Sequence, residues 1–111
     1  MGSVLCHISE IGDGDAKLFD KIAIDGRYHE LFVVRKGRNV FCYVNDCPHL
    51  HITLDVIPGR LMNKTEGVIQ CANHGAKFEI ASGRCIWGPC RGKTLRTKPV
   101  ELINGMVVLK N

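Results

Sequence analysis

The protein has 111 residues, 45% of them hydrophobic and 23% charged, and this length supports one hydrophobic core but not two. Its net charge of +4 is mild and its basic residues are scattered, so even the densest basic run, residues 91–98, does not indicate a nucleic-acid-binding surface. No apolar run reaches the roughly 18 residues that a membrane-spanning helix needs, and residues 1–11 lack the pattern of a secretory signal. We therefore expect one cytoplasmic domain, residues 1–111, that binds neither membrane nor nucleic acid. In that compartment its six cysteines are more readily ligands or thiols than disulfides.

The first half of the chain carries alternating apolar residues and many β-branched side chains, which predict strands. Residues 17–24 and 28–35 are two predicted strands joined at Asp25-Gly26, a dipeptide that suits a tight turn with positive φ. A second turn leads into a third strand at 40–44. No window of about a dozen residues carries an apolar repeat at helical spacing, so the chain is predicted to be all-β.

The second half continues with shorter predicted strands, at 68–71 and 77–80. The strongest hairpin signal lies at Asn104-Gly105, between two apolar segments. Pro99 precedes that hairpin and indicates an edge strand, because proline cannot donate a ladder hydrogen bond.

Two turns carry residues that bind metals. The motif CPHLH supplies Cys47 and His49, and the motif CANHG supplies Cys71 and His74. Two thiolates and two imidazoles can hold zinc or an iron–sulfur cluster. Zinc fingers usually pair two cysteines on one turn and two histidines on another, whereas each turn here carries one of each. This mixed pairing favours a binuclear centre in which the cysteines bind one iron and the histidines the other.

The same motifs carry a resemblance to a known family. CPHLH and CANHGAKFEIASGRCIWGP resemble the two cluster loops and the following strand of Rieske-type [2Fe–2S] proteins, and Gly88-Pro89 resembles the proline loop that covers the cluster in that family. The segment LRTKPVELINGMVVL resembles the family's closing strands. The resemblance implies a Rieske-type antiparallel sandwich or barrel with a small cluster-binding subdomain at about 45–90.

The resemblance also implies the site. It assigns one [2Fe–2S] cluster per chain, with Cys47 and Cys71 on the inner iron and His49 and His74 on the outer iron at the tip of the protein. These four residues are the expected cofactor and metal ligands.

The size of the chain resembles that of the small soluble Rieske ferredoxins that serve bacterial ring-hydroxylating oxygenases in aromatic hydrocarbon catabolism. The implied function is one-electron transport from a reductase to a terminal oxygenase by brief docking at the cluster tip, and not catalysis. High-potential family members carry a cysteine pair and a serine where this chain has Ile52, Asn73 and Ala76. Because those hydrogen-bond donors are missing, we expect a low reduction potential.

Two other interpretations stay open at this point. The chain also resembles, in size and fold, the small Rieske-like subunit of nitrite reductase assemblies, many of which lack the cluster ligands. A zinc-stabilised interaction module would use the same four side chains. A visible spectrum separates that module from the iron–sulfur proteins, because zinc is colourless.

The first cluster loop is followed by a longer segment than is usual in the oxygenase ferredoxins, and we expect the excess to form a surface loop around 58–67. His51 is either a partner-facing tip residue or an exposed histidine without a role. Gly75 and Gly88 are expected to let the backbone approach the cluster closely. Trp87 is expected to pack on the loops.

The remaining cysteines are not expected to bind the cluster. Cys6 and Cys42 alternate with apolar neighbours and are predicted to be buried thiols. Cys85 and Cys90 flank the proposed proline loop at a spacing that permits a disulfide, but a cytosolic redox poise favours two thiols.

Overall fold

The computed structural model describes residues 3–24, 26–46, 48, 54, 61–72 and 75–110. Within these residues the regular elements are β-strands and one short 3₁₀ turn, Ile8–Glu10, so the all-β prediction is confirmed. No helix in this part of the chain is long and apolar enough to cross a membrane. The chain forms two compact units, which we call the terminal unit (residues 1–44 and 97–111) and the central unit (residues 45–96).

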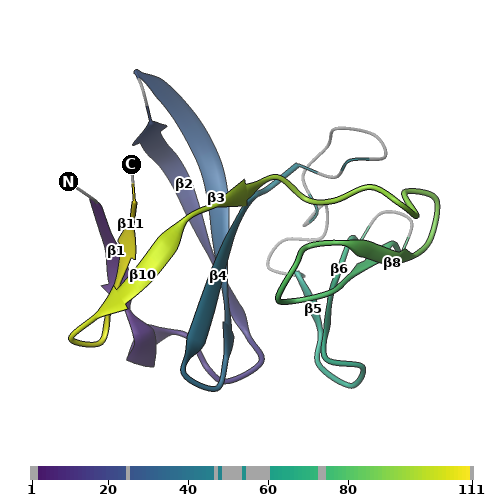
Figure 1. Ribbon diagram of the computed structural model, residues 1–111, viewed down its shortest axis with the longest axis horizontal. Helices are drawn as coiled ribbons and strands as arrows, with labels where there is room; N and C mark the ends of the chain where they lie inside the picture. Colours follow the sequence, from purple (N-terminus) through teal and green to yellow (C-terminus); the bar gives the residue numbers. More distant parts are fainter. Residues whose placement is uncertain are drawn as a thin grey trace. The chain divides into compact units, whose positions relative to one another are not determined.

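The first sheet of the terminal unit joins the two ends of the chain (Figure 1). Its order is β1-β11-β10, with β1 at Ser3–His7, β10 at Val100–Ile103 and β11 at Met106–Leu109. Asn104 and Gly105 form the two-residue turn between β10 and β11, with φ of 50° and 79°, so the predicted hairpin is confirmed. Pro99 precedes the edge strand β10, as expected.

The second sheet of the terminal unit contains the three long strands that the sequence predicts. Its order is β2-β3-β4-β9, and its strands are β2 (Ala16–Ile24), β3 (Arg27–Lys36), β4 (Asn39–Val44) and β9 (Thr97–Lys98). All neighbours are antiparallel, and β4 ends immediately before the first predicted ligand loop.

One buried cluster of the terminal unit is aliphatic and includes two thiols. Its buried residues are Cys6, Ile11, Leu31, Val33, Cys42, Val44, Val107 and Leu109. Desolvation raises the pKa of the Cys6 thiol, and it raises the pKa of Cys42 to about 12. The two predicted buried thiols are therefore confirmed, and both are held in the protonated form at neutral pH.

The central unit is built on a four-stranded antiparallel meander, β5-β6-β7-β8. Its strands are β5 (Met62–Asn63), β6 (Val68–Gln70), β7 (Lys77–Phe78) and β8 (Cys85–Trp87). The predicted strands at 68–71 and 77–80 are thus present but shorter.

The predicted surface loop around 58–67 is wrong in part. Leu61 is buried, and its carbonyl oxygen accepts a hydrogen bond from the Gln70 N–H over 2.9 Å. Met62 and Asn63 form β5 and pair with β6, so these two residues belong to the sheet and not to a surface loop. Only residues 64–67 form an exposed turn, and residues 58–60 lie outside the described residues.

Candidate metal centre

Cys71 stands at the end of β6, where the sequence placed the second ligand turn. Its side chain is buried, with 1% of its surface exposed. The Cys71 N–H donates to the Ala76 carbonyl oxygen over 2.8 Å, and the Gly75 N–H donates to the Cys71 carbonyl oxygen over 3.0 Å. Gly75 has a φ of +70°, a conformation that glycine adopts without strain. The two ends of this turn are therefore fixed to one another.

A pair of hydrogen bonds joins the base of the first ligand turn to that of the second. The side-chain oxygen of Asn45, two residues before Cys47, accepts from the Leu54 N–H over 2.8 Å. The Leu54 carbonyl oxygen accepts from the Ala72 N–H over 2.9 Å, one residue after Cys71. Asn45 and Leu54 are both buried, so these bonds form away from water. The structure thus brings the bases of the two Cys/His turns together.

Asn45 and Leu54 are positions in this hydrogen-bonded base that the sequence did not single out. An asparagine at the end of an apolar strand, next to a cysteine motif, was the available signal, since a polar side chain there has to find a partner once it is buried. The identity of that partner depends on the tertiary fold and is not visible in the local sequence.

The segment that resembles a proline loop packs on the second turn. A Cβ atom on Gly88 would lie 2.8 Å from the Ala76 Cα atom, and Gly88 has a φ of +106°. Gly88 therefore permits a close approach to the backbone of Ala76. Its approach to the cluster sulfides stays a prediction.

Trp87 also packs on this turn. Its ring lies 3.6 Å from where a Cβ atom on Gly75 would stand, and the Lys77 ammonium lies 5.1 Å from the ring centroid. Lys77 also donates to the Glu66 carboxylate over 2.8 Å, and this bond holds the pKa of Glu66 below its usual range. Trp87 therefore packs on the turn as expected, while 55% of its surface remains exposed.

Of the four predicted ligands, the structure describes Cys71. The other three, Cys47, His49 and His74, lie outside the described residues, as do Leu50, His51, Ile52 and Asn73. Within the described ranges, His, Cys, Asp and Glu side chains do not gather in a group of three or more that could hold a metal. Pro48, between Cys47 and His49, is described, and its carbonyl oxygen accepts from the Lys93 ammonium over 3.4 Å.

The described part of the site fits an iron–sulfur cluster. Cys71 is a buried potential thiolate ligand on a turn whose two ends are hydrogen-bonded, and its hydrogen-bond partner Ala76 is an apolar residue that is buried as well. In the sequence, a second cysteine, Cys47, follows Asn45 by two residues. Soft sulfur donors in an apolar setting suit such a cluster.

Solved structures share this fold over nearly the whole chain. A ferredoxin of carbazole 1,9a-dioxygenase from Nocardioides aromaticivorans IC177 is 22% identical with a TM-score of 0.77, and the match covers 98% of this chain and 96% of that one. A Sphingomonas yanoikuyae B1 ferredoxin is 25% identical with a TM-score of 0.73, covering 100% and 99%. A ferredoxin solved in a complex of reduced oxygenase and oxidized ferredoxin in carbazole 1,9a-dioxygenase is 23% identical with a TM-score of 0.74, covering 97% and 100%.

No curated protein matches the sequence. The model of the Rieske [2Fe-2S] domain matches residues 3–103, which include the central unit, most of the terminal unit and all four predicted ligands. The chain therefore belongs to the Rieske [2Fe-2S] domain family, a membership that implies a [2Fe–2S] cluster.

Proposed function

We propose that this protein is a one-electron carrier that passes electrons from a reductase to a terminal oxygenase. Cys47, His49, Cys71 and His74 would hold the cluster, which when bound supplies one-electron oxidation and reduction. The observation that carries the proposal is the hydrogen-bonded link from Asn45 through Leu54 to Ala72, because it joins residues that flank the first predicted ligand motif to the second motif. The protein then needs no bond-breaking residues of its own.

The proposed partners rest on the related structures. Two of them are ferredoxins of carbazole 1,9a-dioxygenase, and one of these was solved together with its oxygenase. We propose the same class of partner here, in the cytoplasm, with the whole chain acting as a single Rieske domain and the cluster-binding part lying within the central unit.

The charge of the central unit supports docking to an acidic surface. Its described basic residues are Lys64, Lys77, Arg84, Arg91, Lys93 and Arg96. Its described acidic residues are Asp46, Glu66 and Glu79. An excess of positive charge around a docking tip accelerates encounter with an acidic partner, and the acceleration is lost as salt is added.

The proposal is tested by mixing the reduced protein with a terminal oxygenase in a stopped-flow instrument without oxygen. The oxygenase used is that of carbazole 1,9a-dioxygenase, and cytochrome c serves as a general electron acceptor. We expect rapid reoxidation by the oxygenase that slows with salt. Reoxidation by cytochrome c but not by the oxygenase would overturn the assignment of the partner while leaving electron transport intact.

The ligand assignment has a separate test. Changing His49 or His74 to Ala should destroy or scramble the visible spectrum, because a ligand sets the coordination of the metal. The matched control is His51→Ala, which should keep the spectrum and at most slow delivery to the oxygenase. Loss of the cluster in the His51 variant would show that the first turn is misassigned.

A further inference from the structure

Cys85 and Cys90 form a close sulfur pair apart from the proposed ligands. Their Sγ atoms lie 2.8 Å apart, with the Cys90 thiol donating to the Cys85 sulfur. The Cys85 thiol lies 3.3 Å from the Trp87 carbonyl oxygen, to which it donates. Both residues are thiols in this structure and both are buried, with 2% and 0% of their surfaces exposed. A disulfide bond needs the two sulfurs to approach to about 2.05 Å, so little movement separates this pair from one.

The backbone holds the pair in place. The Cys85 N–H donates to the Lys93 carbonyl oxygen over 2.9 Å, and the Lys93 N–H donates to the Cys90 carbonyl oxygen over 2.9 Å. The Arg91 N–H also donates to the Gly88 carbonyl oxygen over 3.2 Å. The backbones of both cysteines are therefore hydrogen-bonded to the same residue, Lys93. Forming a disulfide between them does not require the segment to refold.

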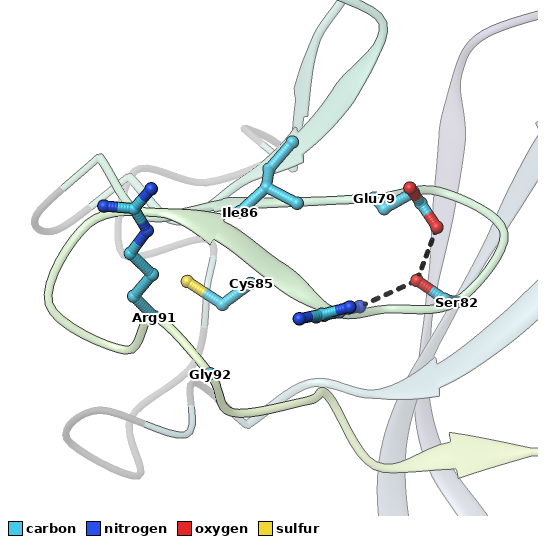
Figure 2. A pocket seen from close by; sticks show the side chains of 7 residues that line it. Glu79, Ser82, Cys85, Ile86, Arg91 and Gly92 are labelled. Carbon is cyan, nitrogen blue, oxygen red and sulfur yellow. Dashed lines mark hydrogen bonds between the residues drawn. The ribbon is translucent and has the colours of Figure 1, made fainter.

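One residue of the pair, Cys85, lines a pocket. An open pocket of about 620 Å³ is lined by Glu79, Ser82, Arg84, Cys85, Ile86, Arg91 and Gly92. Figure 2 shows Cys85 and Arg91 at this pocket, with the Ser82 hydroxyl donating to the Glu79 carboxylate over 2.7 Å. Arg84 and Arg91 suit a solute that carries carboxylates, since guanidinium groups bind carboxylates in a bidentate manner. Cys85 lines this pocket and Cys90 does not, so Cys85 is the residue of the pair that lies nearer to a small acidic disulfide bound there.

We propose that Cys85 and Cys90 are a reversible dithiol–disulfide site that reacts with small acidic disulfides of the glutathione class. The Cys85 thiolate attacks one sulfur of glutathione disulfide, the S–S bond of that molecule breaks, and one glutathione thiol leaves. Cys90 then loses its proton and attacks the Cys85 sulfur, which releases the second glutathione thiol and leaves a Cys85–Cys90 disulfide. Two protein thiols are oxidised, one glutathione disulfide is reduced, and the two protons lost by the protein appear on the released thiols.

The Cys85–Cys90 pair lies in the segment that packs on the second ligand turn. The new bond would close a ring over residues 85–90, and this ring contains Gly88, which rests on Ala76. Oxidation therefore restricts the motion of the cover over that turn without using any proposed cluster ligand. In a reducing cytosol the pair stays as two thiols, and it closes when glutathione disulfide accumulates.

The sequence makes the test direct. Trypsin cuts after Arg84 and Arg91 and releases CIWGPCR, residues 85–91, which holds both cysteines and none of the other four. The protein with its cluster is equilibrated without oxygen in mixtures of reduced and oxidised glutathione and then quenched with acid. The free thiols are alkylated in denaturant, the protein is digested with trypsin, and the peptides are analysed by mass spectrometry. Visible absorption is recorded first, to show that the cluster is still present.

We expect the peptide from oxidised samples to carry no alkyl group and to be lighter by two hydrogen atoms than the unmodified reduced peptide. Added dithiothreitol should return it to the doubly alkylated form. Cys6 is the internal control, because it is a buried thiol outside the pair and should be alkylated in every sample. A doubly alkylated 85–91 peptide at every glutathione ratio would overturn the proposal, as would oxidation that begins only after the cluster has bleached.

Two variants separate the roles of the sulfurs. In Cys90→Ser the second step is blocked, so glutathione should accumulate on Cys85. In Cys85→Ser the thiol at the pocket is gone, so Cys90 should remain unmodified. Equal glutathionylation of the two variants would contradict the assigned order of attack, and no glutathionylation of Cys85 in Cys90→Ser would contradict its reaction with glutathione disulfide.

Discussion

Gly88 rests directly on the backbone of Ala76: a Cβ atom on Gly88 would stand 2.8 Å from the Ala76 Cα atom and 3.2 Å from its Cβ atom. Real Cβ atoms do not approach backbone so closely, and Gly88 also has a positive φ of 106°. Ala76 is buried and accepts, through its carbonyl oxygen, the hydrogen bond from the Cys71 N–H. A side chain at position 88 therefore disturbs the second ligand turn itself.

The first prediction is that Gly88→Ala lowers both the stability and the cluster content of the protein. The matched control is Gly92→Ala, because Gly92 has a φ of +89° but open space where its Cβ atom would stand. Both variants carry the cost of a left-handed alanine, about 1–2 kcal/mol, and Gly88→Ala adds an overpacking cost of about 1–3 kcal/mol. Thermal unfolding and the ratio of iron to protein measure the difference. Equal losses in the two variants would contradict the contact with Ala76.

The second prediction concerns the reduction potential, which for Rieske centres spans about −150 to +300 mV. Since Ile52, Asn73 and Ala76 supply neither a disulfide nor a hydroxyl donor, we expect a value near the low end. Ala76→Ser should raise it if the added hydroxyl donates to a cluster sulfide. Protein-film voltammetry gives both values. A midpoint of the unmodified protein well above zero against the standard hydrogen electrode would contradict the choice of an oxygenase as partner.

The third prediction concerns the stability of the terminal unit in acid. Glu10 accepts hydrogen bonds from the Lys17 ammonium over 2.8 Å and from the His7 N–H over 2.9 Å. The bond to Lys17 above all holds the pKa of the Glu10 carboxyl below its usual value of 4.5. A carboxyl whose pKa is lower in the folded chain stabilises the fold above pH 4.5, and this contribution is lost as the pH falls through the lowered pKa.

Replacing Glu10 by Gln removes that titration but keeps an oxygen for the His7 N–H. We expect the unmodified protein to melt slightly higher than Glu10→Gln at neutral pH and to lose this advantage in acid. The effect is small because both side chains are exposed. Thermal unfolding across the acid range measures it, and Lys17→Met should reproduce the loss. A difference that persists at every pH would assign the effect to packing rather than to charge.

Local signals predicted much of the fold, and distant pairings were missed. The Asn104-Gly105 turn and the long strands β2, β3 and β4 follow from the sequence, because alternation and turn chemistry act over a few residues. Strand β1 was not predicted, because it is short and owes its place to pairing with β11 at the other end of the chain.

In the candidate site too, the local features were predicted and the tertiary contacts were not. The position of Cys71 on a strand-end turn was predicted correctly from its motif. The link through Leu54 could not be predicted, because the hydrogen-bond partners of Leu54 are set by the tertiary fold. The spacing of Cys85 and Cys90 permitted a close pair, but their separation of 2.8 Å depends on backbone bonds to Lys93.

The central claim is that this chain holds a Rieske [2Fe–2S] cluster. The most direct measurement is the content of iron, zinc and acid-labile sulfide in protein made with ample iron and purified without oxygen. We expect two irons and two sulfides per chain, with no zinc. One zinc per chain with no sulfide would contradict it.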